Sequence, residues 1–425
     1  MIVASEATKK ARLEWGDFYD PGGADLFDKA RGFQAALAQE AADGNHFFRR
    51  PILAADGGRA LVRDPEDGRV REVIMLGSNS FLGLSTHPRV VEASRDAARQ
   101  YGFGTGAVSL YAGTTDLHVE LERRIAAFYR VEDAILFPTG YAANVGIITA
   151  LLRKGDAVVN DLFNHASIFD GCIQSGAALH TFAHGRMRHL ERALKRATGP
   201  DHGTLVITDG VFSMEGETAK LDEIVPLARK YGARVMIDEA HAVGVVGPTG
   251  RGTAEKCGVE GEIDVVMGTL SKAPGGIGGY AAGSRELIDY LRYFARPYFF
   301  STSIPAPVIA GLLEVFDILA NDPTLHRALW RNIQYLRGEL DALGFNTGKS
   351  ASAIIPIIGR DEAAVKGMLR DLFAEGIFAN YVAFPAVPKN RPRIRVNVMA
   401  QHTRKELDEV LEAFERLGKK HGIIE

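Results

Sequence analysis

The sequence predicts an α/β fold with a large, mainly parallel sheet and a smaller C-terminal α+β domain. Three observations lead to this prediction. The chain has 425 residues, of which 46% are hydrophobic, enough for a large core and for more than one domain. Between about residues 70 and 320, short continuous apolar runs alternate with helical patterns. After residue 320, strand-like segments mix with two charged helices and with turns of proline and glycine.

We expect three sections along the chain, at residues 1–70, 71–320 and 321–425. The first is an N-terminal arm with a helix over residues 24–44, where Leu26, Ala30, Phe33 and Leu37 recur at helical spacing. The start of this arm, "MIVASEATKKARLEWGDFYD", lacks the apolar core of a signal peptide. The third section contains the strand-like segments "AIIPIIG" and "RPRIRVNVMA".

Six apolar runs in the central section predict strands that are buried on both faces. They lie at residues 134–137, 157–159, 205–207, 235–237, 265–267 and 280–282. Continuous apolar runs separated by helices are typical of parallel sheets, and the polar residues just beyond the carboxyl ends of such strands line the binding crevice. Those polar residues are Thr139, Gly140, Tyr141, Asn164, His165, Asp209, Ser213, Asp238, His241, Thr269, Ser271 and Lys272.

Composition excludes several classes of partner. The net charge is -3, from 50 basic and 53 acidic residues, so neither a nucleic acid nor an anionic membrane surface is an expected partner. No stretch approaches eighteen apolar residues, so no membrane span is predicted. The two cysteines, Cys172 and Cys257, lie far apart and form neither a disulfide framework nor a zinc motif. We therefore expect a cytoplasmic protein without a metal site.

The strand-end residues match the groups that pyridoxal 5'-phosphate requires. Lys272, among the glycines of "GTLSKAPGGIGGY", can form the Schiff base with the aldehyde. Asp238 ends a fully apolar strand, where a buried carboxylate needs a cationic partner such as the protonated pyridine nitrogen. The alternative for Asp238 is a helix N-cap, and the alternative for Lys272 is an exposed solubilising charge.

The remaining strand-end residues fit the ring and the phosphate. His165 can stack on the ring, and His241 can bond its ring oxygen. The phosphate site would combine hydroxyls with the start of a helix, supplied by Gly140, Tyr141, Thr269 and Ser271. Each residue also has a structural explanation, a satisfied polar histidine or a plain strand–helix turn, so the prediction depends on their joint occurrence.

Several long motifs resemble the α-oxoamine synthase family of pyridoxal phosphate enzymes, which have fold type I, the aspartate aminotransferase-like fold. They are "LGSNSFLGLSTHP", "GTTDLHVELE", "NHASIFDG", "TDGVFSMEG", "DEAHAVGVVGPTGRG", "GTLSKAPGGIGGY" and "RPYFFSTSIPAP", in this order from about residue 70 onward. The family condenses a small amino acid with an acyl thioester and releases CO2 and the thiol carrier. The resemblance therefore implies serine, glycine or alanine as one substrate, and an acyl-CoA or acyl-carrier protein thioester as the other.

The resemblance also implies roles for individual residues. Lys272 would hold the cofactor and then act as general base, Asp238 would pair with the pyridine nitrogen, and His165 would stack on the ring and orient the substrate carboxylate. The other implied contacts are His241 and Ser213 at the ring oxygen, Gly140, Tyr141, Thr269 and Ser271 at the phosphate, and Asn79 and Arg395 at the amino acid carboxylate. Thr302 would reach the phosphate of a second subunit, which implies a homodimer with shared active sites.

One stretch departs from the family. After "FGTG" many members carry a small polar residue and an arginine, whereas this chain has Val108 and Ser109. Arg393, two residues before Arg395, is an alternative carboxylate ligand because both lie on the same strand face. "NHASIFDG" and "RPYFFSTS" are most similar to the serine palmitoyltransferase branch, while "TDGVFSMEG" is shared with glycine acyltransferases.

Three other functions share features with this sequence. "DEAH" is also a helicase motif, but "GFNTGKS" has three residues between its glycines where a P-loop has four, and it follows a helix-like segment. An aminotransferase or aldolase of the same fold would share Lys272 and Asp238, and is distinguished by releasing no free thiol. A non-catalytic partner subunit would lack Lys272, which this chain has.

Overall fold

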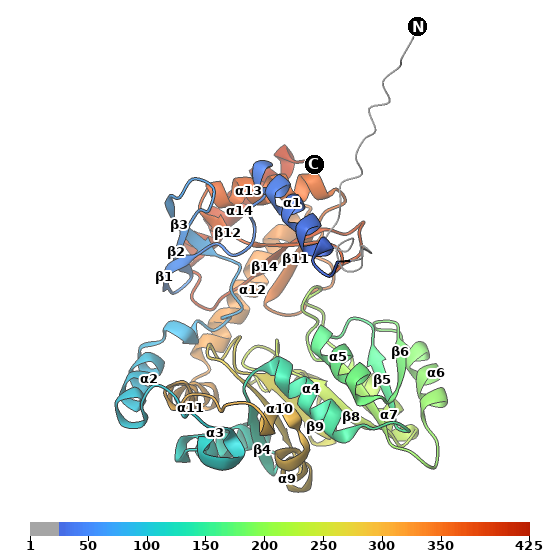
Figure 1. The fold of residues 1–425 in the computed structure, drawn as a ribbon. Helices are drawn as coiled ribbons and strands as arrows, with labels where there is room; N and C mark the ends of the chain where they lie inside the picture. The colour runs from blue at the N-terminus through green and yellow to red at the C-terminus, as the bar shows by residue number, and fades with distance from the viewer. Residues whose placement is uncertain (1–24) are drawn as a thin grey trace.

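A seven-stranded sheet forms the centre of the large domain (Figure 1). Its strands, in spatial order, are β4 (Asp133–Phe137), β10 (Gly279–Gly283), β9 (Val265–Thr269), β8 (Arg234–Asp238), β7 (Thr204–Asp209), β5 (Ala157–Asp161) and β6 (Ala178–Phe182). β10 is antiparallel to β4 and β9, and the other pairs are parallel. The mainly parallel sheet is thus confirmed, and the six predicted runs are six of its strands.

The structure is a computed structural model that describes residues 25–425. The N-terminal segment that lacks the apolar core of a signal peptide, residues 1–20, therefore lies outside the described residues. No described helix has the length and apolar character needed to cross a membrane.

Helices cover both faces of the large sheet and create two separate cores. One face is covered by α4 (Gly140–Leu151), α5 (Ala166–Ser175), α9 (Arg285–Phe294) and α10 (Arg296–Phe299). The other face is covered by α3 (Asp116–Tyr129), α6 (Met187–Ala197), α7 (Leu221–Lys230), α8 (Thr253–Cys257) and α11 (Ala306–Asn321). Successive residues of β4 show the division, because Ile135 packs in the first core and Leu136 in the second. Burial on both faces explains why these strands read as continuous apolar runs.

The smaller domain draws on both ends of the chain (Figure 1). One sheet contains β1 (Ile52–Asp56), β2 (Arg59–Arg63), β3 (Val70–Met75) and β12 (Ile377–Phe378), and a second contains β11 (Ile354–Ile358), β14 (Arg393–Asn397) and β13 (Asn380–Val382). Its long helices are α12 (Thr324–Ala342), α13 (Glu362–Ala374) and α14 (Arg404–Lys420). The expected boundary at residue 70 coincides with the start of β3, whose partners β2 and β12 come from the two sections on either side of the large domain. α2 (Pro88–Tyr101) packs on α11 of the large domain.

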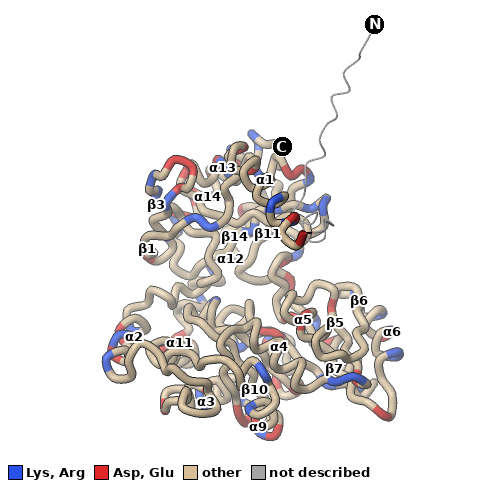
Figure 2. The backbone as a smooth tube through the Cα atoms, viewed as in Figure 1, with Lys and Arg blue, Asp and Glu red and all other residues tan. Residues whose placement is uncertain are grey.

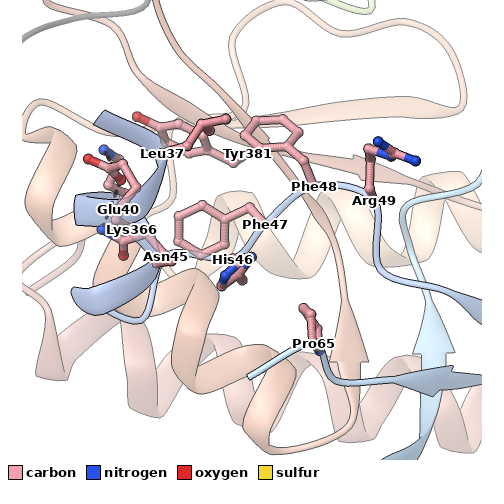
Figure 3. A pocket seen from close by; sticks show the side chains of 11 residues that line it. Leu37, Glu40, Asn45, His46, Phe47, Phe48, Arg49, Pro65, Lys366 and Tyr381 are labelled. Carbon is pink, nitrogen blue, oxygen red and sulfur yellow. Dashed lines mark hydrogen bonds and ion pairs between the residues drawn. The ribbon is translucent and has the colours of Figure 1, made fainter. Parts of the chain in front are cut away.

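The expected N-terminal helix is present as α1 (Asp28–Ala42), with no fully buried side chain. Leu37 of α1 lines a cavity of about 360 Å³ between this helix and the smaller domain (Figure 3). In that cavity Lys366 Nζ lies 3.0 Å from Glu40 Oε2 and 2.8 Å from Glu362 Oε1. None of the predicted site residues lines this cavity.

Candidate active site

A second cavity, of about 230 Å³, lies at the carboxyl ends of β7, β8 and β9. The starts of α4 and α5 close one side of it, because α4 follows β4 and α5 follows β5. Both strands run in the same direction as β9, since β10 is antiparallel to β4 and to β9 and β5 is parallel to β7, so their carboxyl ends lie at the same edge. The structure brings eight predicted site residues together here: Gly140, Tyr141, His165, Asp238, His241, Thr269, Ser271 and Lys272. The other four, Asn79, Ser213, Thr302 and Arg395, do not line it.

Asp238, the last residue of β8, presents a buried carboxylate to this cavity. Its Oδ1 accepts a hydrogen bond from the Ala240 backbone N–H at 2.8 Å, and its Oδ2 accepts one from Asn144 Nδ2 at 2.8 Å. The next helix, α8, begins only at Thr253, so Asp238 is not the helix N-cap that the alternative reading required. Two fixed donors keep this carboxylate oriented.

Lys272 lies in the loop between β9 and β10, beside two carboxyl groups. Burial lowers the pKa of Lys272 to about 8, although Asp238 and Asp209 favour its charged form. The pKa of Asp209, which pairs with Asp238 across β7 and β8, is raised well above its usual value by burial and by the Asp238 charge. The site therefore holds a lysine amine that loses its proton more easily than an exposed one.

The glycines around Lys272 serve the backbone of this loop. Gly275 has a φ of +78°, and a side chain there would meet the Ser85 backbone nitrogen at 2.5 Å. Gly278 has a φ of +129°, a conformation that side chains rarely adopt. The glycine-rich setting therefore reflects a tight loop packed against neighbouring backbone, which fixes where Lys272 stands.

A hydrogen-bond network, buried at Asn144 and Ser167, links His165 to Asp238. His165 precedes α5, and its Nδ1 accepts from the Ser167 backbone N–H at 3.3 Å and lies 2.8 Å from Ser167 Oγ. Asn144 Nδ2 donates to Ser167 Oγ at 2.9 Å as well as to Asp238. Burial lowers the pKa of His165, which favours the neutral ring. Asn144 and Ser167 were not predicted from the sequence. Helical spacing could have indicated Asn144, because it lies four residues after Gly140 and therefore on the same side of α4.

The start of α4 and the Lys272 loop form a polar corner of the cavity. Thr139 caps α4 by accepting from the Ala142 N–H at 3.0 Å, and the first N–H groups of a helix have no partner within it. Thr269 Oγ1 lies 2.9 Å from Ser271 Oγ and would be 2.9 Å from a side chain placed at Gly140. Backbone N–H groups and hydroxyls of this kind bind a phosphate.

His241 supplies a buried polar atom without a partner. Among residues 25–425, its Nδ1 has no hydrogen-bond partner. Burial lowers the pKa of His241 well below its usual value, with Lys272 and Arg395 adding to the effect. A neutral histidine with one unpaired ring nitrogen fits a cofactor oxygen in the same cavity.

Arg395 and Asn79 contact each other but do not line the cavity. Arg395 Nη2 donates to Asn79 Oδ1 at 3.1 Å, and burial lowers the pKa of Arg395 to about 10. The Nε of Arg395 has no partner among the described residues. Arg393, in contrast, donates to the Met214 carbonyl at 2.9 Å and to Glu215 at 3.1 Å. Arg393 Nη2 also has no partner among the described residues, but Arg393 already pairs with the Glu215 carboxylate. Arg395 forms no ion pair in the described part of the chain, so it is the arginine of this strand that is better placed for a further carboxylate.

The network around Asn144 gives a testable prediction. We expect Asn144→Ala to raise the dissociation constant for pyridoxal phosphate about 5- to 30-fold, because Asp238 loses one of its two donors, at a cost of about 1–2 kcal/mol. Titration of the apoenzyme with the cofactor measures this change. Thr149→Ala, which removes only a bond to the α4 backbone, is the control. Equal affinities in the wild-type enzyme and Asn144→Ala would contradict the role of this network.

Comparison with known proteins places the chain in one family. The model for aminotransferase class I and II matches residues 71–414. The chain is 46% identical over 373 residues to the 8-amino-7-oxononanoate synthase of Thermoanaerobacter pseudethanolicus, which covers 88% of this chain and 93% of that protein. It is 40% identical over 385 residues to a 4-hydroxy-2,2'-bipyrrole-5-methanol synthase of Serratia sp., covering 91% of this chain and 59% of that longer protein.

The solved structures agree with the fold. A lysine-to-alanine variant of serine palmitoyltransferase from S. paucimobilis, with a bound aldimine of pyridoxal phosphate and myriocin, superposes with a TM-score of 0.89 at 34% identity, covering 94% of this chain and all of that one. The resemblance seen in the sequence, its fold type I and its cofactor are thereby confirmed, with relatives in more than one branch. The chain belongs to the aminotransferase class I and II family, and within it to the pyridoxal phosphate-dependent α-oxoamine synthases.

Proposed function

We propose that this enzyme condenses serine, glycine or alanine with an acyl thioester, and forms an α-amino ketone, CO2 and a free thiol. The observation that carries the proposal is the meeting of Lys272, Asp238 and His165 in one cavity of an α-oxoamine synthase. When bound, pyridoxal phosphate supplies an electron sink that stabilises negative charge at the amino acid Cα. The residues described above hold the reactants and move the proton.

Lys272 is the proposed attachment point for the cofactor and the proposed general base. When it is not bonded to the cofactor, its amine could take the Cα proton of the amino acid, because a pKa of about 8 leaves part of the amine neutral near neutral pH. Asp238 balances the positive charge of the protonated ring nitrogen. His165, held by Ser167, would face the ring of the bound cofactor and would orient the substrate carboxylate so that proton loss is favoured over loss of CO2.

The remaining roles are proposed for residues around the cavity. Gly140, Tyr141, Thr269 and Ser271 hold the phosphate, and His241 and Ser213 contact the ring oxygen or its neighbours. Arg395 and Asn79 lie outside the lining of the cavity, and they bind the carboxylate of an amino acid that extends beyond it. Val108 forms an isolated bridge with Thr302, and Ser109 begins a short π-helix over Ser109–Gly113. Neither supplies the cation that many family members have here.

A substrate screen tests the proposal. Single amino acids are added to the enzyme with bound cofactor, and the visible spectrum reports which of them bind. Acyl thioesters of graded length are then added, with CO2 and free thiol measured. Equimolar CO2 and thiol supports a synthase, whereas amino-group transfer without thiol release would support an aminotransferase.

We also propose a homodimer with shared active sites. Three aromatic side chains near the Val108–Thr302 bridge are strongly exposed in the single chain: Phe103 (96%), Tyr111 (76%) and Phe300 (66%). Tyr111 contacts Phe299 of α10, with ring centroids 6.1 Å apart. Large exposed apolar groups of this kind mark protein interfaces. Thr302, which does not line the cavity of its own chain, would complete the phosphate site of the partner.

The dimer gives a second prediction. We expect sedimentation at twice the mass of one chain, and we expect Ser301→Ala combined with Thr302→Ala to weaken cofactor binding about 10- to 100-fold, since a charged hydrogen bond contributes about 1.5–3 kcal/mol. Substitution of an exposed hydroxyl elsewhere, Thr181→Ala on the edge strand β6, is the control. A fully active monomer would refute the shared site.

Localisation to the cytoplasm remains part of the proposal. Cys172 and Cys257 are both free thiols, in agreement with a reducing compartment. Coenzyme A and an acyl-carrier protein are both candidate donors of the acyl group.

A further inference from the structure

α6 carries a row of arginines on its exposed face. Arg188, Arg192 and Arg196 follow one another at intervals of four residues, which places them on one side of the helix. The opposite side packs Leu190 and Leu194 into the core under the sheet. All three arginines are exposed, and within residues 25–425 none of them forms an ion pair. We refer to these three residues as the arginine row.

No carboxylate of α6 pairs with the arginine row. Like charges four residues apart destabilise a helix by about 0.2–0.5 kcal/mol per pair. The one acidic residue of α6, Glu191, lies on the flank, with its Oε1 2.9 Å from Lys230 Nζ of α7 and 4.0 Å from Lys195 Nζ. On α3, in contrast, Arg123 pairs with Glu120 at 2.7 Å. Figure 2 shows α6 with basic residues at one end of the large domain.

The row starts near the rim of the catalytic cavity. β6 is parallel to β5, so its carboxyl end lies at the edge of the sheet that holds the site, and four residues separate this end from the start of α6. His184, in that connection, stacks on Phe163 with ring centroids 4.7 Å apart and an interplanar angle of 11°. Phe163 is half-exposed and lies two residues before His165. A short series of neighbouring residues thus joins the cavity to the first turn of α6.

The row also lies away from the proposed dimer contact. α6 covers the β6 end of the large sheet, while α10 contacts β4 at the opposite end (Figure 1). The proposed dimer therefore leaves the arginine row accessible to another molecule.

The shape of the row favours a protein ligand over a small one. From Arg188 to Arg196 the helix rises about 12 Å, at about 1.5 Å per residue. Small anionic ligands bind in concave sites, whereas this row stands on the convex face of a helix. An extended line of cations without partners complements an acidic protein surface, and such complementarity speeds association.

We propose that the arginine row docks an acidic acyl-carrier protein, which delivers the acyl thioester to the cavity beside it. This inference rests on the proposed function, because it names the donor of the acyl group. The thioester arm of the carrier enters past Phe163 and His165, while carboxylates of the carrier pair with Arg188, Arg192 and Arg196.

Charge reversal tests the docking surface. The variant Arg188→Glu/Arg192→Glu/Arg196→Glu is compared with the wild-type enzyme, using one acyl group presented on a bacterial acyl-carrier protein, on coenzyme A and on pantetheine. We expect kcat/KM with the carrier protein to fall about 10-fold or more. Both small thioesters should keep kcat/KM within about twofold, since only the protein donor reaches the row. The matched control, Arg331→Glu/Lys349→Glu/Arg360→Glu, makes the same charge change at exposed positions of the smaller domain and should leave all three donors unaffected.

A binding titration separates this inference from the proposed function. Fluorescence anisotropy of a labelled carrier protein measures docking without turnover, and we expect at least about tenfold weaker binding to the row variant and weaker wild-type binding at high salt. Unchanged carrier affinity in the row variant would overturn the proposal, as would an equal loss with coenzyme A. Failure of the wild-type enzyme to turn over any thioester would contradict the proposed function, while the titration would still decide the docking.

Discussion

Lys272→Ala should lose condensation activity by about 10²–10⁴-fold or more, because it removes both the attachment point of the cofactor and the proposed base. The variant should still fold and bind cofactor and amino acid, since the phosphate corner and Asp238 are intact. In D2O without thioester, the wild-type enzyme should exchange the Cα hydrogen of its amino acid and keep the carboxylate. Lys272→Ala should neither exchange the Cα hydrogen nor catalyse condensation.

Two controls make this result specific to Lys272. Lys349→Ala removes an exposed lysine of the smaller domain and should leave exchange unchanged. Borohydride treatment of the resting enzyme, followed by peptide mapping, should find the cofactor fixed to Lys272. Exchange at the wild-type rate in Lys272→Ala would mean that another residue is the base, and label on a different lysine would overturn the attachment.

Asp238→Asn should lower turnover about 10²–10³-fold with the fold retained, the range found when one preorganised electrostatic partner is removed. Asparagine has a similar shape but carries no charge to balance a protonated ring nitrogen. It also offers one acceptor where the carboxylate offers two, so it cannot satisfy both Asn144 Nδ2 and the Ala240 N–H. Circular dichroism and steady-state rates measure the two parts of this prediction.

Asp209→Asn is the matched comparison for Asp238→Asn. Asp209 stands next to Asp238 in the sheet, but its raised pKa favours the neutral form, so an amide there should change the rate far less. Its bond from the His165 backbone N–H can be kept by the amide oxygen. A normal cofactor spectrum with unchanged rate in Asp238→Asn would contradict the assignment of Asp238.

The sequence could predict the strands that are buried on both faces, because burial itself demands continuous apolar residues. β5 and β8 are of this kind. β6 was missed because it lies at the edge of the sheet, where Leu179 and Thr181 are exposed and no apolar run is needed. Local patterns could not predict the pairing of β3 with β12 either, because it joins residues about three hundred positions apart.

The cavity residues could be predicted for a similar reason. Parallel strands bring their carboxyl ends to one edge, so Asp238, Lys272 and His165 follow from strand order alone. Asn144 and Ser167 lie within helices, and only the packing of α4 against α5 brings them to Asp238. The role proposed for Thr302 involves a second chain, and no pattern within one sequence fixes such a contact.

The most direct test of the central claim is a stoichiometry measurement on the purified enzyme with bound cofactor. The enzyme is given the amino acid and acyl thioester selected by the screen, and CO2, free thiol and α-amino ketone are measured over the same interval. We expect equal amounts of all three products, and none of them from Lys272→Ala. Consumption of the amino acid with formation of an oxo acid, without CO2 or free thiol, would contradict this expectation.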